Sequence, residues 1–236
     1  QMSRFVDIAH VTFHTNSSWL EKMNLAAIFD VFHGINLTEA MQREDFRARV
    51  RNSQGVTLAE ACYGVLMGMD SLALKSDIEV GGIDQLLNFQ QCRKVMRQRG
   101  LAEEVVLMTG MIEGTSGDGR KMSKSFGNYI AVTAPAEDKF GKIMSIPDRL
   151  IEPYFVSFGH VHQRDLPALQ SFIAQEPMEA KKQLGTLVAA LADRDLDTGL
   201  AARDAFERKF SKKDLAETDY IPLTATPGTK VLDVLF

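Results

Sequence analysis

The sequence has few of the residues on which several classes of protein depend. Its two cysteines, Cys62 and Cys92, are too few for a disulfide framework and show no metal-binding spacing with the five histidines. We therefore expect reduced thiols, a cytoplasmic location and no metal site. No apolar run approaches the roughly 18 residues that a membrane-spanning helix needs, and the first residues show no signal-peptide pattern. Attachment to a membrane is not expected.

An excess of one charge is also missing. The 236 residues include 27 Lys and Arg against 31 Asp and Glu, which gives a net charge of −4. This balance excludes DNA or lipid binding by bulk charge but allows a local basic patch. Hydrophobic residues make up 45% and charged residues 25%, as in ordinary globular proteins. The chain begins with Gln1-Met2, so we expect an excerpt or a processed form of a longer protein.

Helical signals dominate the first part of the chain. Helices are predicted to start near 17–21 and to span 37–52. A third helix should follow Thr57, because Thr57 and Glu60 have the spacing of a capping box and apolar residues recur at helical spacing up to Leu72.

The spacing of the apolar residues changes after residue 77. A short buried strand is predicted at 78–80, a helix from about 84 to 99 that ends at Gly100, and a second strand at 105–108. A strand, a helix and a strand within about 30 residues form one crossover unit, so the two strands should be parallel.

Beyond Pro135 the pattern is helical. Helices are predicted near 136–145, 148–158, 166–174, 178–192 and 197–210, and periodicity is lost over 214–236.

The strongest chemical signal is Lys121-Met122-Ser123-Lys124-Ser125, which follows a strand and a glycine-rich loop. Two lysines three positions apart on a mobile loop can clamp the phosphates of a nucleotide, and their charge helps most when pyrophosphate departs. The Ser- and Gly-rich backbone can add amide donors. The alternative interpretation is a solvated basic turn.

A second candidate group is Tyr63, Met67 and Asp70. Positions i, i+4 and i+7 lie within about 60° on a helix, so the three side chains share one face. A phenol and a carboxylate on an apolar helix suggest a pocket that reads the polar ends of a small ligand. A hydrogen-bonded Tyr and a capping Asp would explain the same residues without a ligand.

The third candidate is Gly81-Gly82-Ile83-Asp84-Gln85, at the predicted junction of strand and helix. Glycines allow a close approach of backbone to a ligand, and a helix N-terminus favours anions. Ligands of open parallel sheets bind at the carboxyl ends of the strands. A plain strand–turn–helix joint is the alternative.

From about Thr15 to Phe210 the chain resembles the class I aminoacyl-tRNA synthetases, in particular the bacterial tyrosyl-tRNA synthetases whose loop reads KMSKS. Besides the loop, the resemblance includes Asn16–Leu20, Asp70–Lys75, Val80–Gln85 and Phe140–Ser145. It implies an α/β fold: the second half of a Rossmann-like parallel-sheet catalytic domain, followed by an α-helical anticodon-side domain. The implied ranges are 1–56 for a connective and dimerisation region, 57–145 for the nucleotide-binding half, 146–213 for the helical domain and 214–236 for a tail or linker.

The resemblance also implies a function: activation of tyrosine with ATP and Mg²⁺, and transfer to tRNA by a homodimer that pairs through residues of about 20–75. Lys121 and Lys124, with Ser123, would bind the phosphates. Gly82 and Asp84 would hold the ATP ribose, and the backbone of Met111 and Ile112 would face adenine. Gln85 would orient the amino-acid carboxylate, Tyr63 would lie near the amino group, and Asp70 would accept a hydrogen bond from the substrate phenol.

The sequence departs from the family's pattern in two ways. The family has glutamine where this chain has Met67, and methionine cannot donate N–H groups. The chain also lacks the half with the HIGH signature and the C-terminal RNA-binding module. The alternatives are therefore a divergent paralogue that adenylates another amino acid, or a non-catalytic relative that binds RNA or protein. Basic residues that would meet RNA phosphates, or simply form solvated helix faces, are Lys181, Lys182, Arg203, Arg208, Lys209, Lys212 and Lys213.

Overall fold

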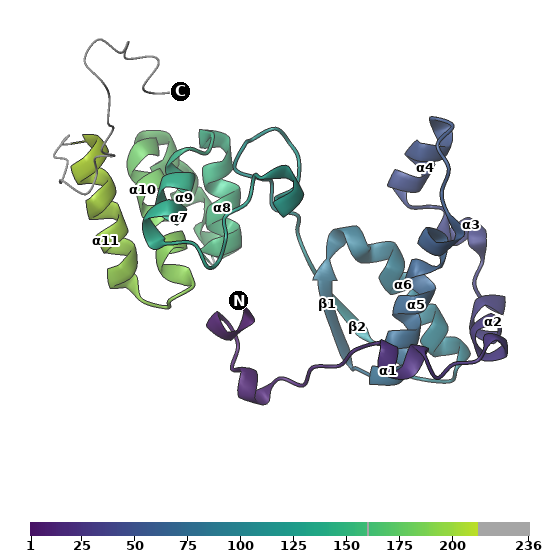
Figure 1. The fold of residues 1–236 in the computed structure, drawn as a ribbon. Coiled ribbons are helices and arrows are strands. Elements are labelled where there is room, and N and C mark those ends of the chain that lie inside the picture. Colours follow the sequence, from purple (N-terminus) through teal and green to yellow (C-terminus); the bar gives the residue numbers. More distant parts are fainter. Residues whose placement is uncertain (160, 212–236) are drawn as a thin grey trace, which may run out of the picture. The chain divides into compact units, whose positions relative to one another are not determined.

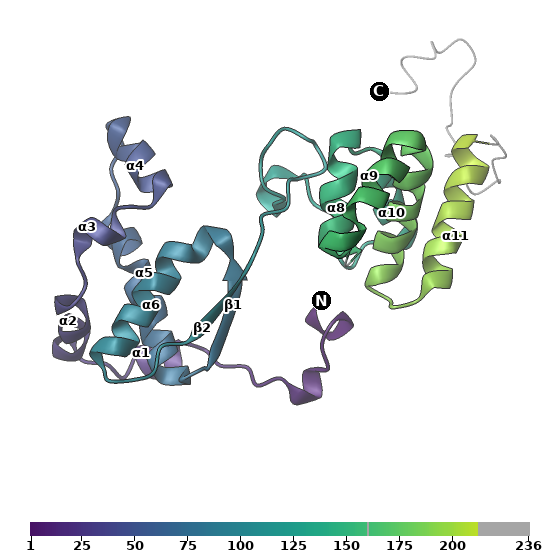
Figure 2. The same cartoon turned by 180° about the vertical axis from the view of Figure 1, so that it is seen from behind.

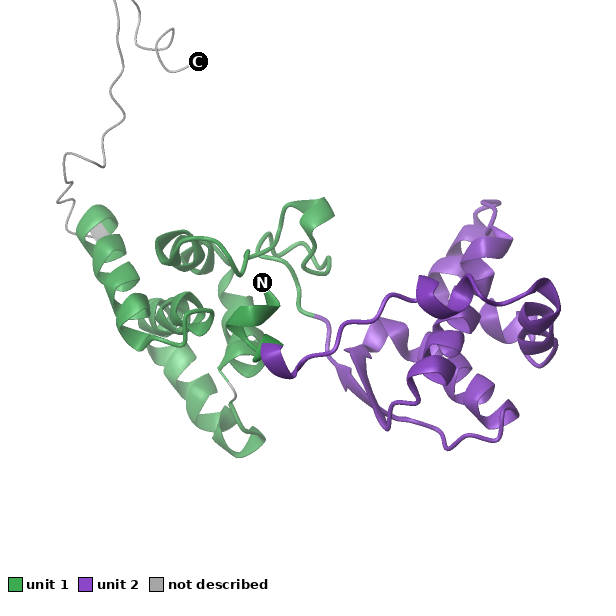
Figure 3. Cartoon of the chain, turned by 60° about the horizontal axis from the view of Figure 1, so that its bottom comes forward, with its two compact units in different colours: residues 1–8, 112–236 green, residues 9–111 purple. Residues whose placement is uncertain are grey.

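The chain divides into two compact units, drawn in different colours in Figure 3. The structure is a computed structural model that describes residues 1–159 and 161–211. The sheet unit is Ala9–Met111, and the helical unit combines Gln1–Ile8 with the chain from Ile112 onward. The division falls inside the predicted range 57–145, whose assignment as one functional half stays a prediction. The predicted tail, 214–236, lies outside the described residues.

The sheet unit contains two strands and six α-helices in its described part. In chain order they are α1 (Ser17–Leu20), α2 (Leu25–His33), α3 (Leu37–Ala40), α4 (Glu44–Arg51), α5 (Leu58–Leu74), β1 (Ile78–Gly82), α6 (Leu86–Gln98) and β2 (Val105–Thr109).

Helix α5 begins as its sequence predicts. The Thr57 side chain accepts from the Glu60 backbone N–H, and the Glu60 carboxylate accepts from the Thr57 backbone N–H, which completes the capping box. Helices α5 and α6 lie side by side, as Figures 1 and 2 show from opposite sides. Their contact is close, because a Cβ on Gly68 of α5 would lie 3.0 Å from the Val95 side chain. This pair contributes Val65, Met69 and Val95 to the core of the sheet unit, to which α2 adds Val31.

The single helix predicted over 37–52 is wrong. The chain forms α3, which ends at Ala40, and α4, which begins at Glu44. Ala40 and Phe46 are both 3% exposed. Six positions apart on one continuous helix, they would point about 120° away from each other. The break lets both side chains be buried.

The predicted crossover is confirmed, because β1 and β2 pair in parallel with Ile78 opposite Val105. The burial predicted for the first strand is wrong: Ile78 is 55% and Val80 65% exposed, and Glu79 turns inward. Successive side chains of a strand point to opposite faces. Helix α6 covers the face that carries Glu79 and Gly81, where a Cβ on Gly81 would lie 2.5 Å from the Phe89 ring.

The helical unit has five α-helices among its described residues, packed side by side (Figures 1 and 2). They are α7 (Ala136–Met144), α8 (Ile151–Phe158), α9 (Leu166–Gln175), α10 (Pro177–Leu191) and α11 (Leu196–Phe206). All five were predicted within a few residues. The core between α7, α8 and α10 includes Ile143, Ile151, Tyr154 and Leu184, each fully buried. Among the described helices, none has both the length and the apolar character needed to cross a bilayer.

Candidate functional site

The lysine-rich segment forms a narrow loop in the helical unit. Glu113 and Lys121 form an antiparallel bridge, the Gly114 N–H donates to the Arg120 carbonyl at 2.9 Å, and the Met122 N–H donates to the Ile112 carbonyl at 2.7 Å. These bonds bring the start and the end of the glycine-rich stretch together. The loop therefore presents Lys121 directly above a paired backbone.

Asn128 fixes the other side of this loop. Its buried side chain accepts from the Ser123 N–H at 2.8 Å and donates to the Lys121 carbonyl at 3.2 Å. Gly114 packs so closely that a Cβ there would lie 2.0 Å from the Asn128 amide nitrogen. Lys121 and Lys124 are both exposed above this base. The arrangement offers two cationic side chains from a braced backbone, which suits the binding of an anion.

In the sheet unit, the predicted face of α5 is formed. Tyr63 is 55% exposed, while Met67 and Asp70 are half-buried. Asp70 accepts a hydrogen bond from the Trp19 indole, with 2.8 Å between Nε1 and Oδ1. Sequence reasoning missed this partner, which lies 51 positions away. The indole occupies one carboxylate oxygen and so orients the other.

At the junction of β1 and α6, Gln85 belongs to a short polar network. Its Oε1 accepts from the Asn88 side chain at 2.7 Å, and its Nε2 donates to Asp84 Oδ2 at 3.4 Å. Gln85 and Tyr63 line the same cavity, of about 330 Å³. Met67, Asp70 and Gly82 do not line it. A larger cavity of about 500 Å³ lies between α7 and α11 and contains none of the predicted site residues.

The two residues expected to face adenine belong to different units. Met111 is 59% exposed at the end of the sheet unit, while Ile112 is half-buried and packs against the core of the helical unit. The chain therefore passes from one unit to the other between them.

One cluster of potential metal ligands was not predicted. Glu79, Cys92 and Glu104 each place an oxygen or sulfur atom within 4.8 Å of the others, and Oε2 of both glutamates is buried without a hydrogen-bond donor. Burial, and then the hydrogen bond to Glu104, raises the pKa of Glu79 to about 8. Burial raises the pKa of the Cys92 thiol to about 12. These directions favour a protonated Glu79 carboxyl group and a protonated Cys92 thiol over the charged groups that a metal ion would need.

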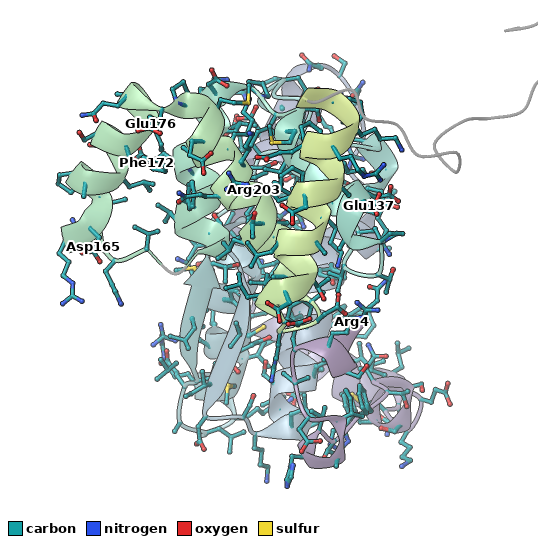
Figure 4. The ribbon with its side chains drawn as sticks, turned by 90° about the vertical axis from the view of Figure 1, so that its left-hand side faces the viewer. Arg4, Glu137, Asp165, Phe172, Glu176 and Arg203 are labelled. Carbon is teal, nitrogen blue, oxygen red and sulfur yellow. The ribbon has the colours of Figure 1, made fainter. Side chains whose placement is uncertain are left out.

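Three of the basic residues considered for RNA binding are occupied within the helical unit. Lys181 is buried and pairs with Asp148 at 2.7 Å, and Lys182 pairs with Glu207 at 2.7 Å. Arg203, labelled in Figure 4, binds both carboxylate oxygens of Glu179 at 2.8 and 3.0 Å. These side chains tie helices together. Lys212 and Lys213 lie outside the described residues.

Comparison with known proteins places these features in a family context. The model of the family described as tRNA synthetases class I (W and Y) matches residues 1–210. The tyrosine–tRNA ligase of Symbiobacterium thermophilum is 32% identical over 98% of this chain and 56% of its own length. That of Shewanella oneidensis is 34% identical over the whole chain and 59% of its own length. The chain thus spans little more than half the length of these curated relatives.

Solved structures with the same fold are more distant in sequence. A mitochondrial tyrosyl-tRNA synthetase of Aspergillus nidulans matches 83% of this chain and 57% of its own, with a TM-score of 0.59 at 18% identity. The tyrosyl-tRNA synthetase of Archaeoglobus fulgidus, solved with L-tyrosine, matches 86% of this chain and 70% of its own, with a TM-score of 0.57 at 20% identity. The expected fold, part of a Rossmann-like synthetase followed by helices, is confirmed.

Proposed function

Because the chain belongs to the class I tRNA synthetases (W and Y), we propose that it is part of a tyrosine–tRNA ligase. Such an enzyme activates tyrosine with ATP and transfers it to tRNA. The observation that carries the proposal is the braced loop with Lys121 and Lys124 exposed above Asn128. The two relatives named above, both tyrosine–tRNA ligases at 32% and 34% identity, support the choice of tyrosine.

In this proposal the two lysines act on the phosphates. Negative charge grows on the bridging and terminal phosphate oxygens as pyrophosphate leaves, and cations already aimed at those oxygens stabilise that state more than the ground state. Ser123 adds a hydroxyl beside them. Magnesium would arrive bound to the oxygens of ATP, the ligand type it prefers.

The sheet unit would supply the remaining nucleotide and amino-acid contacts. Gly82 lets the backbone approach the ribose, and Asp84 would accept from its hydroxyls. Gln85 would donate to the amino-acid carboxylate, and Tyr63 would accept from the amino group. Met111 and Ile112 would contribute backbone groups to adenine. Asp70 would accept from the tyrosine phenol, so phenylalanine would leave a carboxylate unpaired.

The partners follow from this role. We propose tRNA as the acceptor, the cytoplasm as the compartment, and a homodimer formed through residues 20–75. The apolar side chains Leu25 and Phe29 of α2 are 70% and 61% exposed, and Leu58 at the start of α5 is 73% exposed. Large apolar side chains left exposed within this range are consistent with an interface that would cover them.

A second candidate is adenylation of another amino acid, and Met67 is the observation that favours it. This half-buried thioether stands on the same face of α5 as Tyr63 and Asp70, where it provides no N–H donor. Amino-acid-dependent exchange of pyrophosphate into ATP, measured across a panel of amino acids, separates the candidates. Exchange with tyrosine alone excludes the second.

The proposed phosphate contact is tested by the binding of ATP with Mg²⁺. Lys124→Ala should weaken binding by at least about tenfold, because hydrogen bonds to charged groups contribute about 1.5–3 kcal/mol. Lys22→Ala, which removes an exposed lysine at the end of α1, is the matched control and should have no effect. Equal affinities of wild type and Lys124→Ala would contradict the assignment.

A further inference from the structure

Glu113 connects the lysine-rich loop to the helices of the helical unit. Its carboxylate binds Arg149 through two parallel bonds, Nη1 to Oε2 at 2.9 Å and Nη2 to Oε1 at 2.5 Å. Arg149 lies in the 3₁₀ turn Asp148–Leu150 that leads into α8. The same Nη2 also donates to the Gly117 carbonyl at 2.7 Å. One guanidinium therefore holds two points of the glycine-rich stretch.

The backbone of Glu113 makes a separate connection to α8. Its carbonyl accepts from the Tyr154 hydroxyl at 2.6 Å. The Tyr154 side chain is fully buried in the helical core, and this burial raises its pKa to about 12. The phenol therefore stays protonated, and can keep donating, near neutral pH. This contact ties the base of the loop to the buried core of the unit.

On the loop side, Glu113 reaches the backbone that carries the lysines. Its Oε1 accepts from the Gly119 N–H at 2.7 Å, and its own backbone forms the bridge to Lys121. The Arg149 guanidinium beside Glu113 holds the pKa of that carboxyl below its usual value, so the acceptor remains charged. A continuous set of bonds thus runs from Tyr154 through Glu113 to Lys121.

Packing supports the same connection independently. A Cβ on Gly117 would lie 2.4 Å from Cγ of Pro147, the residue that precedes the Arg149 turn. Loop backbone and helical unit therefore meet without room for a side chain. A single exposed ion pair contributes little, and Arg149 is half-exposed. The connection depends on three features together: the two-bond fork between Arg149 and Glu113, the bond from Arg149 to the Gly117 carbonyl, and the buried Tyr154 phenol.

We infer that Glu113, Arg149 and Tyr154 are positioning residues that fix the lysine loop to α8. Lys121 and Lys124 then move with the helical unit rather than as a free loop, so whatever displaces α8 displaces the phosphate-binding lysines. The inference rests on the proposed function only for the identity of the ligand. The mechanical connection itself does not depend on it.

Hydrogen exchange on the whole 236-residue chain tests the connection. Arg149→Met should raise the exchange rates of amides in peptides that cover 113–122 by at least fivefold and leave peptides from α10 unchanged. Arg164→Met is the matched control, because Arg164 is 81% exposed and pairs only weakly, at 3.6 Å, with the neighbouring Asp165. Arg149→Lys keeps a single donor and should restore part of the protection.

A second variant removes a different contact. Tyr154→Phe deletes only the hydroxyl and should raise exchange over the same peptides. Unchanged exchange over 113–122 in both Arg149→Met and Tyr154→Phe would overturn the inference. So would an equal rise throughout the helical unit, because that result indicates general destabilisation.

Binding of ATP with Mg²⁺ to the same variants separates this inference from the proposed function. Arg149→Met should weaken binding several-fold although Arg149 is not assigned any contact with the nucleotide, and Arg149→Lys should recover part of the loss. If exchange rises but wild type binds no ATP, the proposed function fails for this chain while the connection stands. If exchange rises and binding is unchanged, the positioning role is overturned.

Discussion

Met67 decides what the middle of the α5 face can offer to a bound amino acid. Replacing it with glutamine places an amide between Tyr63 and Asp70 on that face. Met67→Gln should raise the affinity for tyrosine by about fivefold, because one added hydrogen bond contributes about 1 kcal/mol. Isothermal titration of wild type and variant with tyrosine measures the difference.

The control for this substitution is Met67→Leu, which conserves volume without adding a donor and should leave the affinity unchanged. A lower affinity of Met67→Gln for tyrosine would indicate that the pocket is built for a substrate with an apolar group at this position. That result would favour the second candidate function.

The buried carboxyl pair gives the sheet unit a pH-dependent stability. The pKa of Glu79 is raised from 4.5 to about 8 by burial, by Glu104 and by the nearby charge of Asp70. The folded state therefore binds a proton that the unfolded state releases. This contribution is complete below pH 4.5 and is lost as the pH rises to about 8, so the free energy of unfolding should fall across that window.

Urea unfolding at pH 5 and pH 8.5 measures the effect. Glu104→Gln removes the second carboxyl group, which lowers the pKa of Glu79, and should reduce the loss of stability between the two pH values. Glu44→Gln changes an exposed carboxylate and serves as the control. An identical pH dependence in wild type and Glu104→Gln would contradict the effect of Glu104 on the pKa of Glu79.

Sequence reasoning identified single residues best where their signal is local. Local spacing placed Tyr63, Met67 and Asp70 on one helical face and Lys121 and Lys124 on one loop, while their roles in binding stay predictions. The Trp19–Asp70 bond and the Glu79–Glu104 pair could not be predicted in this way, because they join residues 51 and 25 positions apart in the sequence. Contacts between residues so far apart in the sequence depend on tertiary packing, which short spacing patterns do not predict.

At the scale of elements, helix limits were predictable where a cap fixed them. The capping box at Thr57 and the proline at the start of α10 mark helices that the structure confirms. The break between α3 and α4 was not predictable, since it follows from burying Ala40 and Phe46 together. The exposure of β1 was also missed, because a hydrophobic strand does not reveal which face the neighbouring helix covers.

The glycine-rich stretch before the lysines allows a matched test of packing. Gly117 and Gly119 both have positive φ, of 65° and 80°. Only Gly117 faces Pro147, and nothing lies within 4 Å of the Cβ position of Gly119. Gly119→Ala should lower the free energy of unfolding by about 1 kcal/mol from backbone strain. Gly117→Ala should lower the free energy of unfolding by about 1–3 kcal/mol more than Gly119→Ala does, because its Cβ would also clash with Pro147.

Urea unfolding of the two variants gives the difference directly. Equal losses for Gly117→Ala and Gly119→Ala would mean that the loop moves away from Pro147 at no cost. The close approach between the loop and the α8 turn would then contribute nothing to stability.

For the whole molecule, the order of elements was predictable and the division into units was not. The sequence has no linker composition near Met111 and Ile112, and the chain crosses between two residues that both look like core. Compactness depends on how many long-range contacts each segment makes. The division into two units therefore cannot be inferred from a sequence whose composition is that of a globular protein throughout.

Self-association is the prediction that belongs to this scale. If residues 20–75 form the dimer interface, Phe29→Asp should raise the dissociation constant at least tenfold, because it places a charge where an aromatic side chain would be buried. Phe13→Asp, at a residue 65% exposed outside that range, is the control. Sedimentation velocity over a concentration series measures both, and unchanged association of Phe29→Asp would exclude α2 from the interface.

The buried thiol of Cys92 has a practical consequence. It is completely covered between α5 and α6, and its high pKa keeps it unreactive in the native state. Alkylating reagents reach it only when the two helices separate. In a Cys62→Ser background, the rate at which a maleimide modifies the chain would therefore report how often the sheet unit opens, with no dye or isotope introduced.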